Sequence, residues 1–297
     1  MTSVLYDAPG PKAKARNWIY SGIFVVLVGL ALWWALSLMA EKGQLDADKW
    51  TPFVTDSQVW TTFLIPGLLE TLKAGAIAMV IALPLGALLG IGRLSDHAWV
   101  RIPVGAVVEF FRAIPVLMLM LFGFALYSRY TAVPSDVRPL YAAVTGLVLY
   151  NASVIAEIVR AGVLSLPRGQ TDAAKAIGMR KGQAMVHVLL PQAVTAMLPA
   201  LVSQLVVILK DTALAGALLG LGELLSTARQ ISANYSNTIA TLFVIALLYI
   251  VVNFALTTLA SWLEGRQRKS TKSTGAVVAG DVAEVDAGGA AGVGEAP

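Results

Sequence analysis

Long apolar runs, separated by short polar stretches, dominate the hydrophobic pattern of this chain. A helix needs about 20 apolar residues to cross the hydrocarbon core of a bilayer. Runs of that size, or runs interrupted by few charges, predict six spans. They lie at Ile19–Ala40, Ile65–Gly92, Pro103–Ser128, Leu140–Gly162, Pro191–Asp211 and within Gln230–Leu263. A seventh apolar piece, Ala213–Gly222, is too short to span and is interpreted as re-entrant or interfacial.

The composition agrees with the bilayer as the solvent for this chain. Of its 297 residues 57% are hydrophobic and 13% are charged, whereas soluble domains carry about 25% charged residues. There is no cysteine, and the two histidines, His97 and His187, are far apart in sequence. We therefore expect no disulfide, no metal site and no cofactor. The fold class that this predicts is an all-α membrane protein with about six transmembrane helices.

The basic residues predict the orientation of the spans. If both termini are cytoplasmic, most Lys and Arg residues outside the spans fall in cytoplasmic segments, as the positive-inside rule requires. Only five then lie outside: Lys42, Lys49, Arg129, Arg138 and Arg229. The net charge of +4 is thereby explained as an orientation signal, and no nucleic-acid partner is expected. The predicted location is the cell membrane, with several passes and both termini in the cytoplasm.

The segment between the fourth and fifth predicted spans has the pattern of two short helices separated by a glycine. Thr171 is a plausible N-cap, and Asp172 suits the positive end of a helix. Ala173, Ala176 and Ile177 share one small apolar face. Gly178 can adopt the left-handed conformation that ends a helix. By helix chemistry alone, an ordinary amphipathic connector is the favoured interpretation of this segment.

The spacing of this segment resembles the signature loop of ABC-importer permeases. That loop has Glu/Asp-Ala-Ala, then Gly after three residues, then Ile/Val-x-Leu-Pro after nine more. Here it reads Asp172-Ala173-Ala174, Gly178 and Val188-Leu189-Leu190-Pro191, with Asp for the usual Glu and Val for the usual Ile. The coupling residues implied by the resemblance are Asp172, Ala173, Ala174, Ile177, Gly178, Leu190 and Pro191.

Further segments over residues 64–263 resemble the polar amino-acid uptake permeases. Glu109–Pro115 is similar to their E-x-F-R-G-T-P stretch, with Ala113 and Ile114 replacing Gly and Thr. The other similar segments are Gly67–Lys73, Ala156–Arg160, Leu166–Gln170, Leu190–Ala193 and Leu209–Thr212. Within that family the pattern is most similar to glutamate permeases. The resemblance implies a five-helix type I importer core with an added N-terminal helix, and glutamate as cargo.

This assignment predicts that the chain is divided into three regions. Residues 1–63 hold a cytoplasmic tail, the extra transmembrane helix and an external loop. Residues 64–263 form the permease domain, with a coupling loop at 163–190. Residues 264–297 are rich in Gly, Ala and Val and are predicted to be a disordered cytoplasmic tail. The partners that the resemblance implies are cytoplasmic ABC ATPase subunits, a second homologous permease subunit in a heterodimer, an extracytoplasmic amino-acid-binding protein and the lipid bilayer.

Ionisable residues within spans are costly and suggest function. Glu109 and Arg112, like Glu157 and Arg160, stand three residues apart on one helix face. Their structural interpretation is mutual pairing that fixes helix packing. Arg112 precedes Pro115, which must disturb the helix and free backbone groups, so we expect Arg112 to line the path of the substrate. Lys210, Asp211 and Thr212 are expected near the outer end of the fifth span, either as part of an external gate or as an interfacial anchor.

Two other function classes compete with the importer permease. A secondary transporter driven by an ion gradient would need intramembrane carboxylates, for which Glu109 and Glu157 are the central candidates. That interpretation leaves the Asp172 loop unexplained. A membrane enzyme would need a catalytic grouping, and no His-Glu-x-x-His motif is present. The chain also lacks a Gly-x4-Gly-Lys-Ser/Thr loop, so we expect no catalytic activity here and ATP hydrolysis on a partner chain.

Overall fold

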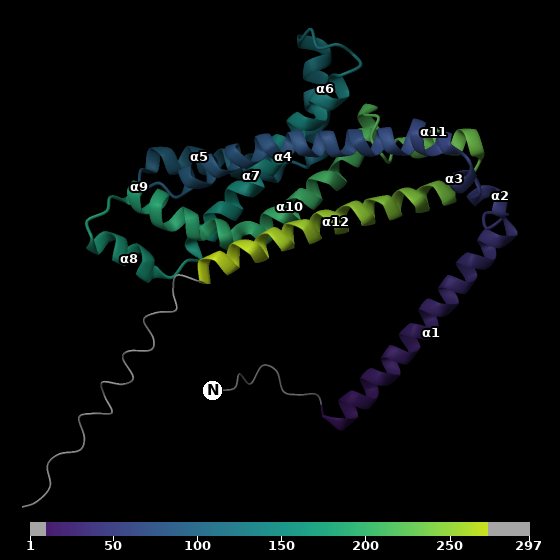
Figure 1. The fold of residues 1–297 in the computed structure, drawn as a ribbon, viewed down its shortest axis with the longest axis horizontal. Helices are drawn as coiled ribbons and strands as arrows, with labels where there is room; N and C mark the ends of the chain where they lie inside the picture. The colour runs from purple at the N-terminus through teal and green to yellow at the C-terminus, as the bar shows by residue number, and fades with distance from the viewer. Residues whose placement is uncertain (1–9, 273–297) are drawn as a thin grey trace, which may run out of the picture.

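The computed structural model describes residues 10–272, and these residues form helices without any strand. Figure 1 shows an elongated bundle built from α4, α7, α10 and α12, with α1 apart from it. The long helices are α1 (Pro11–Glu41), α4 (Ile65–Arg93), α7 (Arg138–Leu164), α10 (Leu190–Leu219) and α12 (Thr238–Lys272). Five helical segments are long and apolar enough to cross a membrane, and a bent pair of helices gives a sixth. The predicted all-α membrane fold is confirmed.

Shorter elements connect the long helices. Before α4 stand α2 (Ala47–Trp50), α3 (Pro52–Thr55) and the π-helical segment η1 (Val59–Leu64). Between α4 and α7 stand α5 (Ala98–Ala113) and α6 (Val116–Tyr130). Between α7 and α10 stand α8 (Arg168–Ala176), α9 (Lys181–Ala184) and the π-helical η2 (Met185–Leu189). Helix α11 (Thr227–Tyr235) connects α10 to α12.

Helices α4 and α7 pack closely against each other. Gly86 and Gly90 on α4 face α7 one turn apart, and small residues at this spacing let two membrane helices approach closely. A Cβ added at Gly86 would lie 2.7 Å from the backbone oxygen of Ala152 on α7. At Gly90 it would lie 2.7 Å from the backbone oxygen of Ala156. Glycine is therefore required at both positions by the distance between the two backbones.

A buried polar pair joins α7 to α10 further along the bundle. The Gln204 side-chain amide donates a hydrogen bond to the Asn151 side-chain oxygen, and Asn151 donates to the backbone oxygen of Leu147 at 2.7 Å. Asn151 is fully buried and Gln204 nearly so. Since neither amide is left unsatisfied, the pair fixes the register of these two helices in an apolar surrounding.

The predicted third span is broken near its middle. Helix α5 ends at Ala113, Ile114 and Pro115 are extended, and α6 starts at Val116, with 96° between the two helices. The break lies where Pro115 was expected to disturb the predicted span over 103–128, which consists of two helices. Proline at 115 removes a backbone donor and disfavours helical geometry at Ile114, which explains the break.

The predicted end of the fifth span, near Asp211, is wrong. Helix α10 runs through Lys210 and Asp211 to Leu219, and Gly220 ends it in the left-handed conformation at φ 79°. Ala213–Leu219 is therefore a continuation of the span and not a separate re-entrant piece. Helix α12 continues past Leu263 to Lys272. The rest of the predicted tail, residues 273–297, lies outside the described residues, as do residues 1–9.

Helix α1 packs against nothing in the described chain. None of its residues is buried, and Trp18 is 80% exposed. Its apolar residues are distributed around the whole circumference, as expected for a helix surrounded by lipid. The connector after it is fixed: the Trp60 indole donates to the Phe53 backbone oxygen at 2.7 Å, and the Tyr235 hydroxyl donates to Asp56. This second hydrogen bond lowers the pKa of the Asp56 carboxyl.

Candidate functional site

The predicted coupling loop forms a compact helical hairpin at one end of the bundle. Helix α8 is followed by Gly178 in the left-handed conformation, at φ 80°, as the sequence predicted. The helix begins at Arg168, three residues before the predicted N-cap Thr171, which lies inside it. Pro167 occupies the N-cap position, because a proline without a backbone donor is tolerated where the first helical N–H groups have no partner.

One face of α8 is anchored and the opposite face is free. Ala174 is 3% exposed and points into the protein, whereas Ile177 is 77% exposed. Asp172, Ala173 and Ala176 are also exposed. The small apolar face predicted from the sequence is therefore uncovered in the described chain, and it is available to another protein.

Two polar contacts attach this hairpin to the long helices. The Gln192 amide, in the first turn of α10, donates to the Gln170 side-chain oxygen on α8 at 3.0 Å. The Lys181 ammonium donates to the Leu94 backbone oxygen at 2.8 Å and to the Asp96 carboxylate. The hydrogen bond from Lys181 lowers the pKa of Asp96. The loop is thus connected both to α10, which Leu190 and Pro191 begin, and to the turn between α4 and α5.

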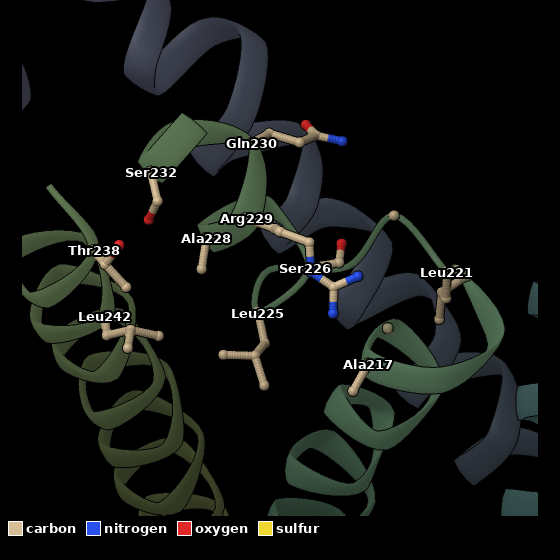
Figure 2. Close-up of a pocket in the computed structure, with 13 residues that line it drawn as sticks. Ala217, Leu221, Leu225, Ser226, Ala228, Arg229, Gln230, Ser232, Thr238 and Leu242 are labelled. Atoms are coloured by element: carbon tan, nitrogen blue, oxygen red, sulfur yellow. The ribbon is translucent and has the colours of Figure 1, made fainter. Parts of the chain in front are cut away.

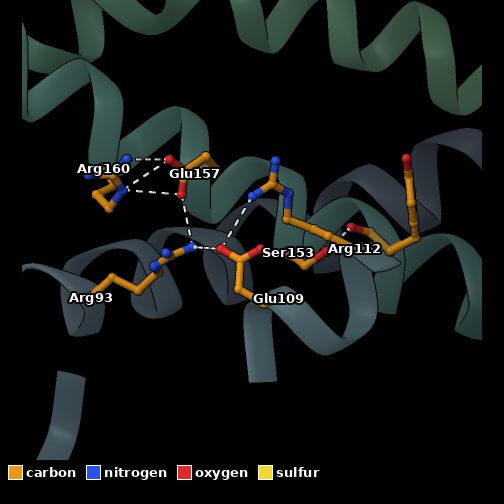
Figure 3. A network of polar contacts seen from close by, with 7 residues as sticks. Arg93, Glu109, Arg112, Ser153, Glu157 and Arg160 are labelled. Atoms are coloured by element: carbon orange, nitrogen blue, oxygen red, sulfur yellow. Dashed lines mark hydrogen bonds and ion pairs between the residues drawn. The ribbon is translucent and has the colours of Figure 1, made fainter. Parts of the chain in front are cut away.

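A charge network joins three helices, as Figure 3 shows. The charge network consists of five residues: Arg93, Glu109, Arg112, Glu157 and Arg160. The Arg93 guanidinium lies 2.9 Å from both the Glu109 and the Glu157 carboxylates. Arg160 Nε donates to Glu157 at 3.0 Å, and Arg112 lies 3.5 Å from Glu109.

The network brings together four predicted residues and one that the sequence assigned elsewhere. The pairing of Glu109 with Arg112 and of Glu157 with Arg160 occurs within α5 and α7, as their spacing suggested. Arg93, which follows the predicted second span and was counted only among the cytoplasmic basic residues, bridges the two pairs from the end of α4. No local spacing signals this, because its partners are 16 and 64 residues away.

The network is not electrically neutral. Three arginines face two glutamates, so it holds one excess positive charge. Arg93 is largely enclosed, with 17% of its side chain exposed, whereas 36% of Arg112 is exposed and its Glu109 contact is the longest of the set. Arg112 also stands next to the extended backbone at Ile114 and Pro115. It is therefore the arginine best placed to offer donors to an anion.

The residues predicted as an external gate or interfacial anchor are not part of the charge network. Lys210, Asp211 and Thr212 lie in the second half of α10. Thr212 is fully buried and donates to the Leu209 backbone oxygen at 2.7 Å, whereas Lys210 is exposed. Within the described residues neither Lys210 nor Asp211 forms an ion pair.

A buried carboxylate that the sequence did not single out fixes the turn after α10. Glu223 is fully buried and accepts hydrogen bonds from the backbone N–H groups of Leu225, at 2.8 Å, and Ser226, at 2.7 Å. It also accepts one from the Tyr249 hydroxyl of α12 at 2.9 Å. The Leu224 N–H donates to Thr71 on α4 at 3.0 Å. The turn is thereby tied to α4 and α12, and burial raises the pKa of the Glu223 carboxyl.

Comparison with known proteins identifies the family. Residues 82–269 match the family described as the inner membrane component of binding-protein-dependent transport systems. The chain belongs to this family. It is therefore a multi-pass permease subunit of the inner membrane, and ATP hydrolysis belongs to a separate partner subunit. Its family also implies a substrate-binding protein as a partner.

Individual relatives of this permease agree with that assignment. It is 48% identical over 238 residues to the glutamate transport system permease protein GluD of Corynebacterium glutamicum, covering 78% of this chain and 86% of that one. It is 33% identical over 210 residues to the glutamate/aspartate import permease protein GltK of Escherichia coli, covering 69% of this chain and 93% of that one. The alternative of an ion-gradient transporter finds no support among these relatives.

Solved structures support the architecture of the permease. The crystal structure of an amino acid ABC transporter with histidines has a chain that superposes with a TM-score of 0.63 at 28% identity, covering 70% of this chain and 95% of that one. The inward-facing MetNI methionine ABC transporter superposes with a TM-score of 0.59 at 25% identity, covering 72% and 99%. The bundle thus has the fold of an ABC importer membrane subunit.

Proposed function

We propose that this permease carries glutamate, or a closely similar acidic amino acid, into the cell at the expense of ATP hydrolysed by its partner. The observation that carries the proposal is its 48% identity to a glutamate transport system permease protein over most of both chains. The excess positive charge of the charge network is consistent with an anionic cargo.

The coupling loop at 163–190 is the docking element for the ATPase in this proposal. Asp172, Ala173 and Ile177 are exposed on α8, and Gly178 ends that helix sharply. A helix with small side chains on its free face fits a groove on another protein, because nothing bulky keeps the two backbones apart. Movement of α8 would reach α10 through Gln192 and the α4–α5 turn through Lys181.

A second permease subunit completes the translocation path in this proposal. In Figure 1, α6 stands out from the bundle formed by α4, α7, α10 and α12, an arrangement that suits contact with a neighbouring subunit. We place a second, homologous permease against this subunit, as a heterodimer. Arg112 and Pro115, at the break between α5 and α6, would line the path between the two subunits.

The orientation of the chain can be tested by labelling, because it has no native cysteine. We propose that both termini are cytoplasmic, which places Ser95 inside and Ser135 outside. A membrane-impermeant maleimide should label Ser135→Cys in intact cells and Ser95→Cys only after permeabilisation. The reverse pattern would overturn the proposed orientation without affecting the family assignment.

Reconstitution in proteoliposomes tests the function directly. The complete system contains this chain, the second permease, the ATPase and the loaded binding protein. Uptake of radiolabelled glutamate should require all four components and ATP. A complex with Ile177→Asp, which places a charge on the proposed docking face, should lose ATP-dependent uptake, whereas Val54→Asp, at an exposed position outside the coupling loop, should not. Uptake of a neutral or basic amino acid in preference to glutamate would refute the cargo assignment.

A further inference from the structure

A cavity of about 550 Å³ lies where α10, α11 and α12 meet, and the function described above does not account for it. It is within the size range of small-molecule sites. Figure 1 places α11 at the end of the bundle opposite α8. Since α8 is the proposed cytoplasmic docking element, the cavity lies at the outer end, where a binding protein would release its cargo.

The chemistry of the cavity favours an anion. Its one charged lining residue is Arg229, and Figure 2 shows this side chain reaching from α11 into the space between α10 and α12. No carboxylate of the described residues forms an ion pair with it. The acidic residue nearest in sequence, Glu223, is fully buried and bonded to its own turn and to Tyr249.

Polar groups around Arg229 complete the lining. Ser226, Gln230, Ser232 and Thr238 contribute hydroxyl and amide groups. The Ser232 hydroxyl oxygen is buried and has no hydrogen-bond partner among the described residues. A buried hydroxyl without a partner is unusual in a protein and needs an explanation. The hydroxyl is enclosed in this conformation, so a polar ligand could supply the missing partner only if the Ser232 side chain turned toward the cavity.

A second cavity, with a largely apolar lining, lies next to the first. It measures about 430 Å³ and is lined by Lys210, the other cation of this region. Leu225 and Leu242 line both cavities, so the two hollows share an apolar wall. No acidic residue lines either of them. An anion leaving Arg229 would therefore meet a second positive group further along α10.

From these observations we propose that the Arg229 cavity is the outer recognition site for the carboxylate of the transported amino acid, and that Lys210 is the next positive group on its way. This inference rests on the proposed function, because it requires an acidic or zwitterionic amino acid as cargo. It gives α11 a direct role in receiving the substrate.

Equilibrium dialysis of the purified permease–ATPase complex with radiolabelled glutamate, without binding protein, tests the site. Arg229→Gln should lower glutamate affinity at least fivefold, and Arg229→Lys should retain most of it. Arg129→Gln is the matched control, because Arg129 is also an exposed arginine predicted to be external and has no ion pair among the described residues. Ala217→Leu, which narrows the cavity without changing its charge, should also weaken binding.

Two further measurements distinguish the ways in which the inference could fail. Unchanged glutamate binding by the folded Arg229→Gln complex would overturn it. A loss of binding-protein docking in co-sedimentation, with glutamate binding intact, would overturn it in favour of a protein contact. If wild-type proteoliposomes take up no glutamate at all, the proposed function fails. If wild type and Arg229→Gln both transport and bind glutamate equally well, only the role of the cavity fails.

Discussion

The glycines at the α4–α7 contact offer the sharpest test of how this bundle is held together. In Gly86→Ala the new Cβ would lie 2.7 Å from the Ala152 backbone oxygen and 2.7 Å from the Ile155 Cβ. Ordinary contact begins at 3.4 Å, so both distances are about 0.7 Å too short. Neither atom is the end of a flexible side chain, so the strain can be relieved only by moving the two helices apart.

The change in the free energy of unfolding caused by Gly86→Ala is the sum of a packing cost and a gain in helix propensity. Overpacking of a close contact costs about 1–3 kcal/mol. Replacing glycine by alanine inside a helix stabilises by up to about 1 kcal/mol. Gly105→Ala, on α5, isolates the second term, because nothing lies within 4 Å of the Cβ that it adds. The difference between the two variants is therefore the packing cost alone, about 1–3 kcal/mol.

Thermal unfolding of the purified complex in one detergent measures this difference. For a bundle of this size each kcal/mol corresponds to a Tm shift of about 2–4 °C, so Gly86→Ala should melt about 2–12 °C below Gly105→Ala. Glutamate uptake should fall with it, because Arg93 and Glu157 meet across the same pair of helices. Equal Tm values for the two variants would refute the argument that backbone proximity requires glycine at this position.

Three further predictions concern polar groups. Glu223→Ala should destabilise the complex by about 1–3 kcal/mol by leaving buried donors unpaired, whereas Glu223→Gln keeps an acceptor and should cost less in the same thermal assay. Arg93→Met should lower Tm and uptake together, and restoring stability with lipid should not restore uptake if the network has a transport role. The Tm difference between wild type and Asp96→Asn should stay constant from about pH 8 to pH 5 and shrink as pH falls below 3.8, because a lowered pKa stabilises the fold only while the carboxyl is ionised.

The sequence predicted the elements that depend on local patterns. Apolar runs located the membrane helices, and Gly178 was expected to end α8 in the left-handed conformation that it adopts. The start of α8 was misplaced because Thr171 is a good N-cap by composition, although Pro167 and the packing of Ala174 set the actual boundary. Local signals thus identified the element but not its first residue.

Features that depend on distant contacts could not be predicted. Pro115 signalled a disturbance, but its consequence, a 96° change of direction, depends on how α6 packs against α7. Lys210 and Asp211 were interpreted as the end of a span, although they lie inside α10. Two adjacent charged residues give the same sequence pattern inside a helix as at its end, so the sequence alone does not distinguish the two cases. Arg93 and Glu223 act through partners on other helices, so no spacing in the sequence reveals their roles.

Helix α1 has a consequence for how the sequence of this protein can change over time. Since none of its residues is buried, substitutions among its apolar side chains have no packing cost within this subunit. The Escherichia coli relative aligns over 93% of its own length with only 69% of this chain, so a permease of this family can be shorter than this one. Because Trp60 and Tyr235 fix the connector, α1 can be lost, replaced or given a new role without changing how the other helices pack. Among the long helices of the described chain, α1 is the one whose sequence is least constrained by the folding of this subunit.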